Sequence, residues 1–236
     1  MVTQRTIEWS IDGETYEGFF AAPASGAKGA VLICHAWAGR GAHEEAFAKR
    51  LAARGYAAMA GDVYGKGVLG TNNEECEALM TPLAQNRGLL QTRLRTGLDN
   101  LMSQNECQGL KAVAAGFCFG GLSVLDLARE GAPVEGVAAF HAILGAREDG
   151  STDPIKAEVL ALQGFDDPMA GADDLTAFSK EMTERKARWQ LLTFGGVAHA
   201  FTNEQANMPE MGLQFDAFAR DRSYAAFDDF LARLTA

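Results

Sequence analysis

The fold of this chain is decided by the stretch Gly116-Phe117-Cys118-Phe119-Gly120, which joins two runs of different character. Residues 111–115 form a short apolar run typical of a buried strand, and residues 122–129 carry the apolar pattern of a helix. The flanking glycines permit a sharp turn from strand to helix that lifts the Cys118 side chain to the upper edge of a sheet. The sequence therefore predicts a nucleophile elbow that carries a thiol where a serine usually stands.

The alternative for Cys118 is a small buried apolar residue, which is the common role of a free cysteine. Two downstream motifs favour the reactive role, Gly164-Phe165-Asp166-Asp167 and Gly196-Val197-Ala198-His199. They follow Cys118 in the order nucleophile, acid, base, which is the order of α/β-hydrolases. The sequence thus predicts a catalytic triad of Cys118, His199 and Asp167.

The acid and the base each have rivals in the sequence. We favour Asp167 over Asp166 because Pro168 follows it directly and ends any helical continuation. His35 and His141 are rival bases because each ends a predicted strand and could reach the same edge of the sheet, and either could instead line the pocket.

A thiol nucleophile needs activation by its surroundings. A free thiol has a pKa of about 8.5, so only a few per cent is ionised at neutral pH. An imidazole and a helix N-terminus both favour the thiolate. We expect His199 to supply the imidazole, and a carboxylate to fix its tautomer.

Composition sets the limits for the whole chain. With 236 residues, 47% of them hydrophobic, it can bury one substantial core, so we predict a single domain over residues 1–236. Strand and helix signals alternate, which predicts an α/β fold of the α/β-hydrolase type: a mostly parallel sheet with helices on both faces. The formal charge of −10 argues against nucleic-acid or membrane partners, since both need clustered cations.

The expected elements follow from local patterns. Asp12-Gly13 predicts a hairpin turn, and Thr71 with Glu74 resembles a capping box at the start of a long helix that is broken near Pro82 or Gly88. Strands are predicted at 5–10, 15–21, 30–34, 56–61, 111–116, 134–140, 157–163 and 189–194, and helices at 44–54, 71–105, 119–130, 172–187 and 215–234.

No segment of the sequence indicates export, membrane insertion or metal binding. No apolar run reaches the roughly 18 residues of a membrane span, and the start lacks a secretory core, so we expect a cytoplasmic protein. The four cysteines lack the spacing of a disulfide framework. His43-Glu44 opens like a zinc-protease motif, but Phe47 stands where the second histidine belongs, so we expect neither metal nor cofactor.

Two further motifs are given ordinary roles. The run Gly65-Lys66-Gly67-Val68-Leu69-Gly70 fits the pattern of a dinucleotide-binding turn, but the next convincing strand is about 40 residues away rather than within a unit of about 30. Ser123 lacks the second glycine of an elbow, so we expect an ordinary helix residue.

At this point the sequence resembles the dienelactone hydrolase family. The resemblance runs from the strand that ends at His35, through Asp62-Val63-Tyr64-Gly65 and residues 116–121, to Gly164-x-x-Asp167 and His199-Ala200-Phe201. It covers nearly the whole chain, and the cysteine elbow is its most specific part.

The resemblance implies the triad of Cys118, His199 and Asp167, with an oxyanion hole formed by the backbone N–H groups of Phe119 and Trp37. One such donor is typically worth about 3–4 kcal/mol of transition-state stabilisation.

Two positions depart from the family pattern. In relatives of the founding enzyme, the histidine that corresponds to His35 is followed directly by a glutamate, which engages the resting thiol. This chain has Ala36 at that position. These relatives also carry an arginine four residues after the catalytic histidine, where this chain has Asn203. Activation is then expected to rest on His199, and an anionic lactone is not the expected substrate.

The expected substrate is a small neutral ester or lactone, preferably aromatic. Aromatic and apolar residues are predicted on strand-end loops, where ligands of parallel sheets bind, although each could instead pack the core. The expected pocket includes Ala36, Tyr64, Phe165, Met169, Phe201 and Asn203, beside the oxyanion residues Trp37 and Phe119.

Alternative functions remain at the sequence level. The cysteine elbow and the lost glutamate also resemble a metagenome-derived family member that is a promiscuous phosphotriesterase, which implies attack of Cys118 on neutral aryl phosphotriesters. A non-catalytic ligand-binding protein and a thiol redox sensor are alternatives from other classes, since an exposed thiolate also forms a sulfenic acid.

Overall fold

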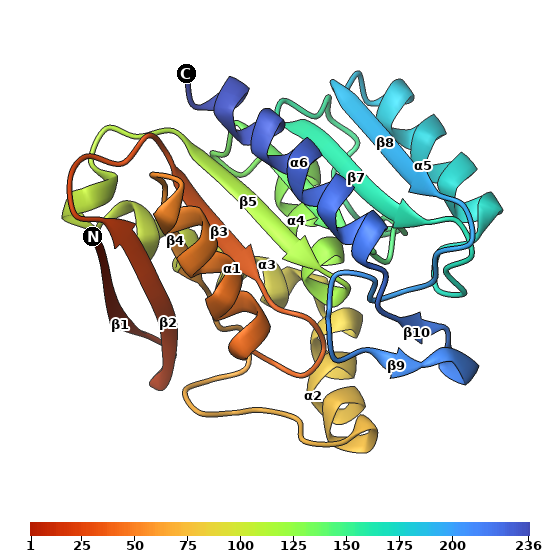
Figure 1. The fold of residues 1–236 in the computed structure, drawn as a ribbon, viewed down its shortest axis with the longest axis horizontal. Coiled ribbons are helices and arrows are strands. Elements are labelled where there is room, and N and C mark those ends of the chain that lie inside the picture. The colour runs from red at the N-terminus through yellow and green to blue at the C-terminus, as the bar shows by residue number, and fades with distance from the viewer. The chain divides into compact units, whose positions relative to one another are not determined.

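A computed structural model describes residues 1–236 of the protein. The chain forms two compact units, residues 1–114 with 235–236, and residues 115–234. Figure 1 labels the helices and strands of both. The assignment of residues 1–236 to one domain stays a prediction.

The first unit contains four strands whose hydrogen-bonded order is β1, β2, β4, β3. The pairs β1–β2 and β2–β4 are antiparallel and β4–β3 is parallel. The predicted hairpin is confirmed: Asp12 and Gly13 both have positive φ, of 52° and 88°, as a two-residue turn of this kind requires. The bounds are β1 (Val2–Ile11), β2 (Glu14–Pro23), β3 (Ala30–Cys34) and β4 (Ala57–Ala60).

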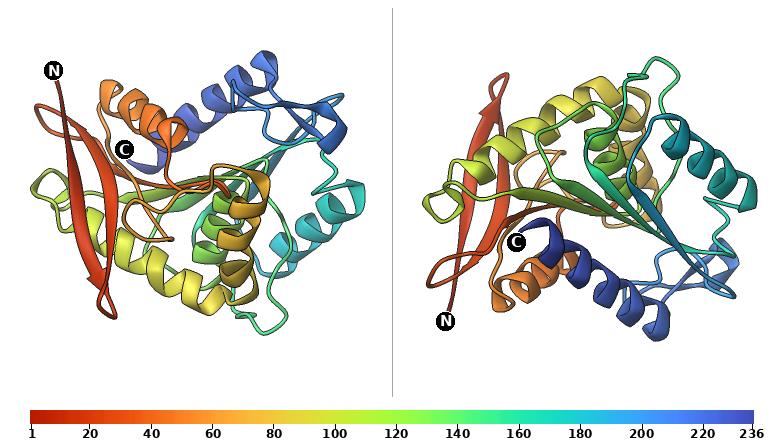
Figure 2. Two further views of the ribbon diagram at one scale, coloured as in Figure 1. Left: turned by 90° about the horizontal axis from the view of Figure 1, so that it is seen from below. Right: turned by 90° about the horizontal axis from the view of Figure 1, so that it is seen from above.

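Helices cover both faces of these strands. In Figure 2, α1 lies on one face and α3 on the other. Every residue of β3 and β4 is buried, which explains why both strands are continuous apolar runs in the sequence. The helices of this unit are α1 (Ala42–Ala53), α2 (Asn73–Gln85) and α3 (Arg87–Met102), with a 3-10 turn at Asn105–Cys107.

The predicted capping box of Thr71 with Glu74 is wrong. The N-cap of α2 is Asn72, whose side chain accepts a hydrogen bond from the Glu75 N–H at 3.0 Å. The Thr71 hydroxyl instead donates to the Glu75 carboxylate at 2.6 Å. Asparagine is the better capping residue, so the helix begins one residue later.

The long helical region is broken at Asn86. This residue ends α2 and caps α3, because its side chain accepts a hydrogen bond from the Leu89 N–H at 3.1 Å. Pro82 lies within α2 and Gly88 in the first turn of α3, so neither residue marks the break itself.

The second unit contains strands in the order β5, β6, β7, β8, with parallel pairing of β6–β7 and β7–β8. In Figure 2, α6 covers one face of these strands, and α4 and α5 cover the other. Strand β5 begins in the first unit and ends in the second. The bounds are β5 (Ala112–Phe117), α4 (Phe119–Arg129), β6 (Gly136–Phe140), β7 (Glu158–Gly164), α5 (Ala172–Glu184), β8 (Trp189–Phe194) and α6 (Ala217–Leu234).

A small hairpin before α6 was not predicted. Strands β9 (Asn207–Met208) and β10 (Leu213–Gln214) are antiparallel, and a 3-10 turn at Pro209–Met211 lies between them. Two-residue strands carry no periodic signal that a sequence could reveal.

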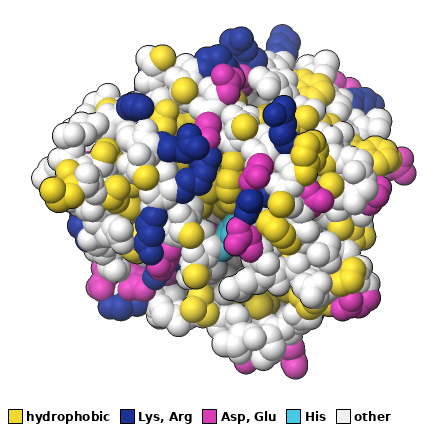
Figure 3. All heavy atoms as spheres, viewed as in Figure 1, with side chains coloured by type: hydrophobic (Ala, Val, Ile, Leu, Met, Phe, Trp, Pro, Cys, Tyr) yellow, Lys and Arg dark blue, Asp and Glu magenta, His cyan; other side chains and the backbone are white.

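Basic and acidic side chains are interspersed on the surface of the protein (Figure 3). On the face drawn in Figure 3, basic side chains lie in separate small groups among acidic and hydrophobic ones. No helix combines the length and the apolar character that crossing a membrane requires.

A buried arginine joins α4 to α5. Arg129 is 4% exposed and donates to both carboxylate oxygens of Glu181, at 2.9 and 2.6 Å. It also donates to the Leu144 carbonyl at 2.7 Å and lies 3.3 Å from the Asp126 carboxylate. Removing the cation would leave the buried Asp126 carboxylate without its counter-charge, while the partly exposed Glu181 would keep Arg185 at 3.6 Å.

We therefore expect Arg129→Met to lower the free energy of unfolding by about 3–5 kcal/mol, measured by urea denaturation. Arg147→Ala is the matched control. Arg147 pairs with Asp149, which is 80% exposed, so its loss should change the free energy by less than about 1 kcal/mol. Equal effects of the two variants would contradict a structural role for the Arg129 cluster.

Candidate active site

The turn between β5 and α4 is strained at Cys118. This residue has φ of 54° and ψ of −113°, a backbone conformation that residues other than glycine rarely adopt. The Cys118 N–H donates to the Phe140 carbonyl at 3.0 Å, and the Cys118 carbonyl accepts from Leu122 at 3.2 Å. The end of β6 and the first turn of α4 therefore hold the strained residue from both sides.

Two glycines allow this turn. A Cβ atom at Gly116 would overlap the Gly120 carbonyl, and one at Gly121 would lie 2.5 Å from the Ala142 Cβ. The helix thus starts so close to the end of β5 that Gly116 tolerates no side chain, and Gly121 packs the helix against the residue pair that follows β6. The close approach at Gly116 agrees with the predicted elbow.

Cys118 differs from the other three cysteines in exposure. It is partly exposed, whereas Cys34, Cys76 and Cys107 are buried. Burial raises the pKa of Cys34 and of Cys107 to about 12, and it also raises the pKa of Cys76. Cys118 is consequently the thiol best placed to react.

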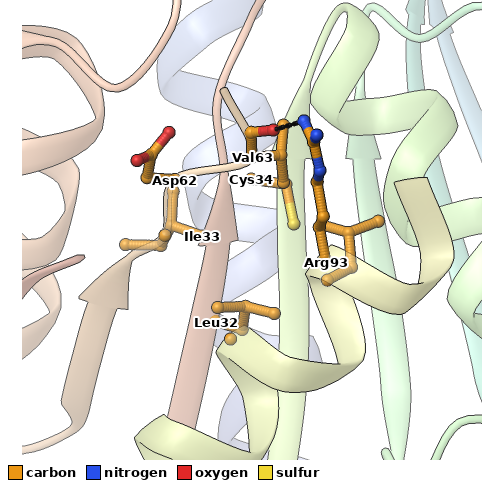
Figure 4. A pocket seen from close by; sticks show the side chains of 9 residues that line it. Leu32, Ile33, Cys34, Asp62, Val63 and Arg93 are labelled. Carbon is orange, nitrogen blue, oxygen red and sulfur yellow. Dashed lines mark hydrogen bonds between the residues drawn. The ribbon is translucent and has the colours of Figure 1, made fainter. Parts of the chain in front are cut away.

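Cys34 lines a small cavity of about 10 Å³ in the first unit, which Figure 4 shows. Arg93 lies beside it and donates to the Val63 carbonyl at 2.6 Å. A cavity of this size holds at most a single water molecule, so it is not a substrate pocket.

The main chain of His199 is held by the unpredicted hairpin. The His199 N–H donates to the Gly212 carbonyl at 2.8 Å, and its carbonyl accepts from Gln214 at 3.0 Å. These bonds add His199 to the edge of β10, opposite Leu213. The position of this imidazole therefore depends on a segment that carries no recognisable motif.

The structure brings His199 together with Asp167. His199 Nδ1 lies 2.7 Å from Asp167 Oδ2, and both side chains are buried. The other carboxylate oxygen of Asp167 accepts from the Met169 N–H at 2.8 Å. Asp166 is exposed, and its N–H donates to the Val197 carbonyl at 3.0 Å.

Close packing at Gly164 sets this contact. A Cβ atom at Gly164 would overlap the Val197 carbonyl and lie 2.6 Å from the Ala198 carbonyl. The end of β7, three residues before Asp167, therefore lies directly against the loop that carries His199. This explains the glycine at the start of the Gly164-x-x-Asp167 motif.

The surroundings of His199 favour its protonated form. Burial lowers its pKa, but the charge of Cys118 and the hydrogen bond with Asp167 outweigh burial and raise the pKa to about 10. Its second ring nitrogen, Nε2, is buried, and no nitrogen or oxygen atom of the protein forms a hydrogen bond with it. A protonated imidazole beside a thiol favours the thiolate, and Nε2 is available to exchange a proton.

The rival bases have other contacts. His35, in the first unit, has its Nδ1 2.7 Å from the Ala36 carbonyl, and its Nε2 accepts from Val63 at 3.3 Å. Burial lowers the pKa of His35. His141, at the end of β6, has its Nε2 2.7 Å from the Thr202 hydroxyl. Neither has the Asp167 contact of His199.

The predicted pocket and oxyanion residues of the first unit lie in the loop after β3 or contact it. The Tyr64 hydroxyl donates to the Trp37 carbonyl at 2.9 Å. The buried Glu44 carboxylate accepts from Ala36 at 3.3 Å and from Gly41 at 3.0 Å, and burial raises its pKa. Glu44 thus shapes the loop that carries Ala36 and Trp37, a role that the sequence did not suggest. The participation of Trp37 in an oxyanion hole stays a prediction.

The predicted pocket residues of the second unit have different surroundings. Phe165 and Met169, on either side of Asp167, are 50% and 41% exposed. Phe201 is fully buried and packs against Phe194, with ring centroids 5.7 Å apart. Asn203 is half-buried, and its side chain accepts from Gln205 at 3.0 Å.

The fold defined by these elements is that of an α/β-hydrolase. Comparison with known families matches residues 16–235 to the Dienelactone hydrolase family. The chain belongs to this family, as the sequence resemblance predicted, and it is accordingly a hydrolase that acts on ester bonds.

Similar solved structures cover almost the whole chain. A dienelactone hydrolase-like promiscuous phosphotriesterase from metagenomic libraries is 31% identical, with a TM-score of 0.92 over 99% of this chain and 98% of the other. A structure named m3DLH is 29% identical, with a TM-score of 0.93 over 100% and 99%. A protein of Aquifex aeolicus, provisionally named a carboxymethylenebutenolidase, is 25% identical over 84% of this chain and 87% of its own length.

The pKa of His199 leads to a prediction for the reactivity of Cys118. The raised pKa shows that His199 and Cys118 interact, and an imidazolium beside a thiol favours its reactive form, so alkylation by iodoacetamide at pH 7 should be about tenfold faster in wild type than in His199→Asn. Cys118→Ser controls for reaction at the buried cysteines. An unchanged rate in His199→Asn would contradict the coupling.

Proposed function

We propose that the protein hydrolyses neutral esters and lactones through a covalent thioester, without a metal ion. Cys118 is the nucleophile, His199 exchanges the protons, and Asp167 fixes the orientation of His199. The observation that carries this proposal is the 2.7 Å contact of the two buried side chains, His199 and Asp167, in a unit that also holds Cys118 on a strained turn.

The first half-reaction forms the thioester. The Cys118 thiolate attacks the ester carbonyl carbon, a carbon–sulfur bond forms, and the π electron pair moves to the carbonyl oxygen. The Phe119 N–H lies in the first turn of α4, at the positive end of the helix dipole, and would stabilise this oxyanion. When the intermediate collapses, the carbon–oxygen bond to the leaving group breaks, and the departing alkoxide takes the proton from His199 Nε2.

The second half-reaction uses the change of charge on Cys118. A sulfur in a thioester carries no charge, so the contribution that raised the pKa of His199 is lost and burial lowers that pKa. Neutral His199 then takes a proton from water while the oxygen attacks the thioester carbon. The carbon–sulfur bond breaks, the thiolate leaves, and the acid product departs, which restores the protonated His199 beside the thiolate.

The residues near Asp167 support a neutral, apolar substrate. Phe165 and Met169 present exposed apolar surface on both sides of this residue. Asn203 supplies no cation that could bind a carboxylate, in contrast to the arginine of relatives of the founding enzyme. Aryl esters and lactones combine a neutral ring with a good leaving group, so they are the preferred candidates.

Aryl phosphotriesters are the second candidate substrates. The observation that favours them is the likeness to a promiscuous phosphotriesterase, with 31% identity and a TM-score of 0.92. Cys118 would attack phosphorus, form a sulfur–phosphorus bond and expel an aryloxide that is protonated by His199. Water activated by His199 would then cleave that bond and release the phosphodiester.

The test compares wild type with Cys118→Ala on a 4-nitrophenyl ester and on an aryl dialkyl phosphate, after treatment with a chelator. We expect a covalent adduct on Cys118 in acid-quenched samples by mass spectrometry, and turnover that Cys118→Ala abolishes. The two rates rank acyl against phosphoryl transfer. Equal turnover by the variant, or loss of turnover on chelation, would overturn the mechanism, and no turnover at all would favour a binding protein or a thiol sensor.

The two aspartates provide a second, more specific test. Asp167→Asn should lower kcat by about 10³- to 10⁴-fold, because an asparagine no longer holds the productive tautomer of His199. Asp166→Asn is the matched control and should leave kcat within about twofold, since an exposed carboxylate outside the proton path contributes little. Comparable losses in both variants would refute the assignment.

A further inference from the structure

A second buried imidazole lies against His199 and has no role in the proposed reaction. His141 follows β6 and is 2% exposed. Its ring packs edge-to-face against that of His199, with centroids 5.1 Å apart and planes at 69°. Asp167 holds one nitrogen of the His199 ring, and His141 supports the ring from a second element of the fold.

The backbone of His141 is strained and firmly held. Its φ is 37°, which is uncommon and unfavourable for a residue with a side chain. The His141 N–H donates to the Leu162 carbonyl at 2.7 Å, and the next residue, Ala142, exchanges two hydrogen bonds with the buried Gln163 side chain at 2.5 and 3.2 Å. Strand β7 therefore imposes the direction in which His141 points.

Thr202 ties this ring to the loop of the proposed base. Its hydroxyl lies 2.7 Å from His141 Nε2, and it is 1% exposed. Thr202 follows His199 by three residues, and Ala200 between them also has a positive φ, of 60°. The contact of Thr202 with His141 consequently closes a ring of interactions from β6 to the His199 loop and back to the His199 side chain.

We propose that His141, held by Thr202, is a positioning residue that fixes the orientation of the His199 ring. The proposal rests on the proposed function, in which Nε2 must protonate the leaving group in the first step and take a proton from water in the second. Asp167 restrains the ring only through Nδ1, so rotation about that bond would move Nε2 away from the reacting atoms. The His141 ring, packed against that of His199, opposes that rotation.

The effect on rate follows from geometry. A displacement of about 1 Å in a proton-transfer group lowers turnover by about 100-fold, whereas binding of the substrate is little affected. Cys118, Asp167 and His141 are the polar groups that face the His199 ring in this unit. Disturbing His141 should thus change kcat and the coupling of His199 to Cys118, and should leave KM close to its original value.

The test uses two variants of one side chain. Thr202→Val removes the hydroxyl and keeps the shape, and Thr202→Ser keeps the hydroxyl. We expect Thr202→Val to lower kcat by about 10- to 100-fold with KM within about twofold, and Thr202→Ser to retain kcat within about threefold. The alkylation rate of Cys118 at pH 7 should also fall in Thr202→Val and stay near the wild-type rate in Thr202→Ser.

Two outcomes would overturn the proposal: wild-type kcat with a wild-type alkylation rate in folded Thr202→Val, or equal losses in Thr202→Val and Thr202→Ser. Should Thr202→Val fail to fold, His141→Asn replaces it, because asparagine tolerates a positive φ and removes the ring. Unchanged kcat in that variant would equally overturn the proposal. Turnover that survives in Cys118→Ala would instead refute the proposed function, and the alkylation rate at pH 7 would still report the coupling of His199 to Cys118.

Discussion

The site depends on one backbone constraint, the positive φ of Cys118 between β5 and α4. This conformation turns the chain directly from strand to helix, and the closeness of the two elements leaves room only for a hydrogen atom at Gly116. The strain persists because Phe140 and Leu122 hold the residue by its own N–H and carbonyl groups. A partly exposed thiol at a helix N-terminus is the result.

The pKa of His199 depends on the charge of two neighbouring residues in the second unit. A buried imidazole would ordinarily lose its proton, and the charges of Cys118 and Asp167 reverse that tendency. The larger of these contributions comes from Cys118, the residue that would bond to the substrate. In the proposed reaction, the same histidine would therefore be a proton donor in the first step and a base in the second, without an additional titrating group.

Local patterns in the sequence predicted the strands and helices next to the triad candidates. For β8, the predicted range of 189–194 is the range in the structure. The proline after Asp167 distinguished it from Asp166, and the structure gives Asp167 the hydrogen bond to His199. The contact of His141 with Thr202 joins residues 61 positions apart, and no local pattern encodes it. The hairpin at His199 was missed for a related reason, since its strands are too short for periodicity and act only through main-chain bonds.

That hairpin bears on how the enzyme could diverge. It holds His199 through backbone groups of Gly212 and Gln214, so these hydrogen bonds do not require the side chains of the turn. Met211, next to Gly212, is 40% exposed. Natural variation or laboratory evolution can therefore alter the size and polarity of this surface without removing the backbone bonds that hold His199.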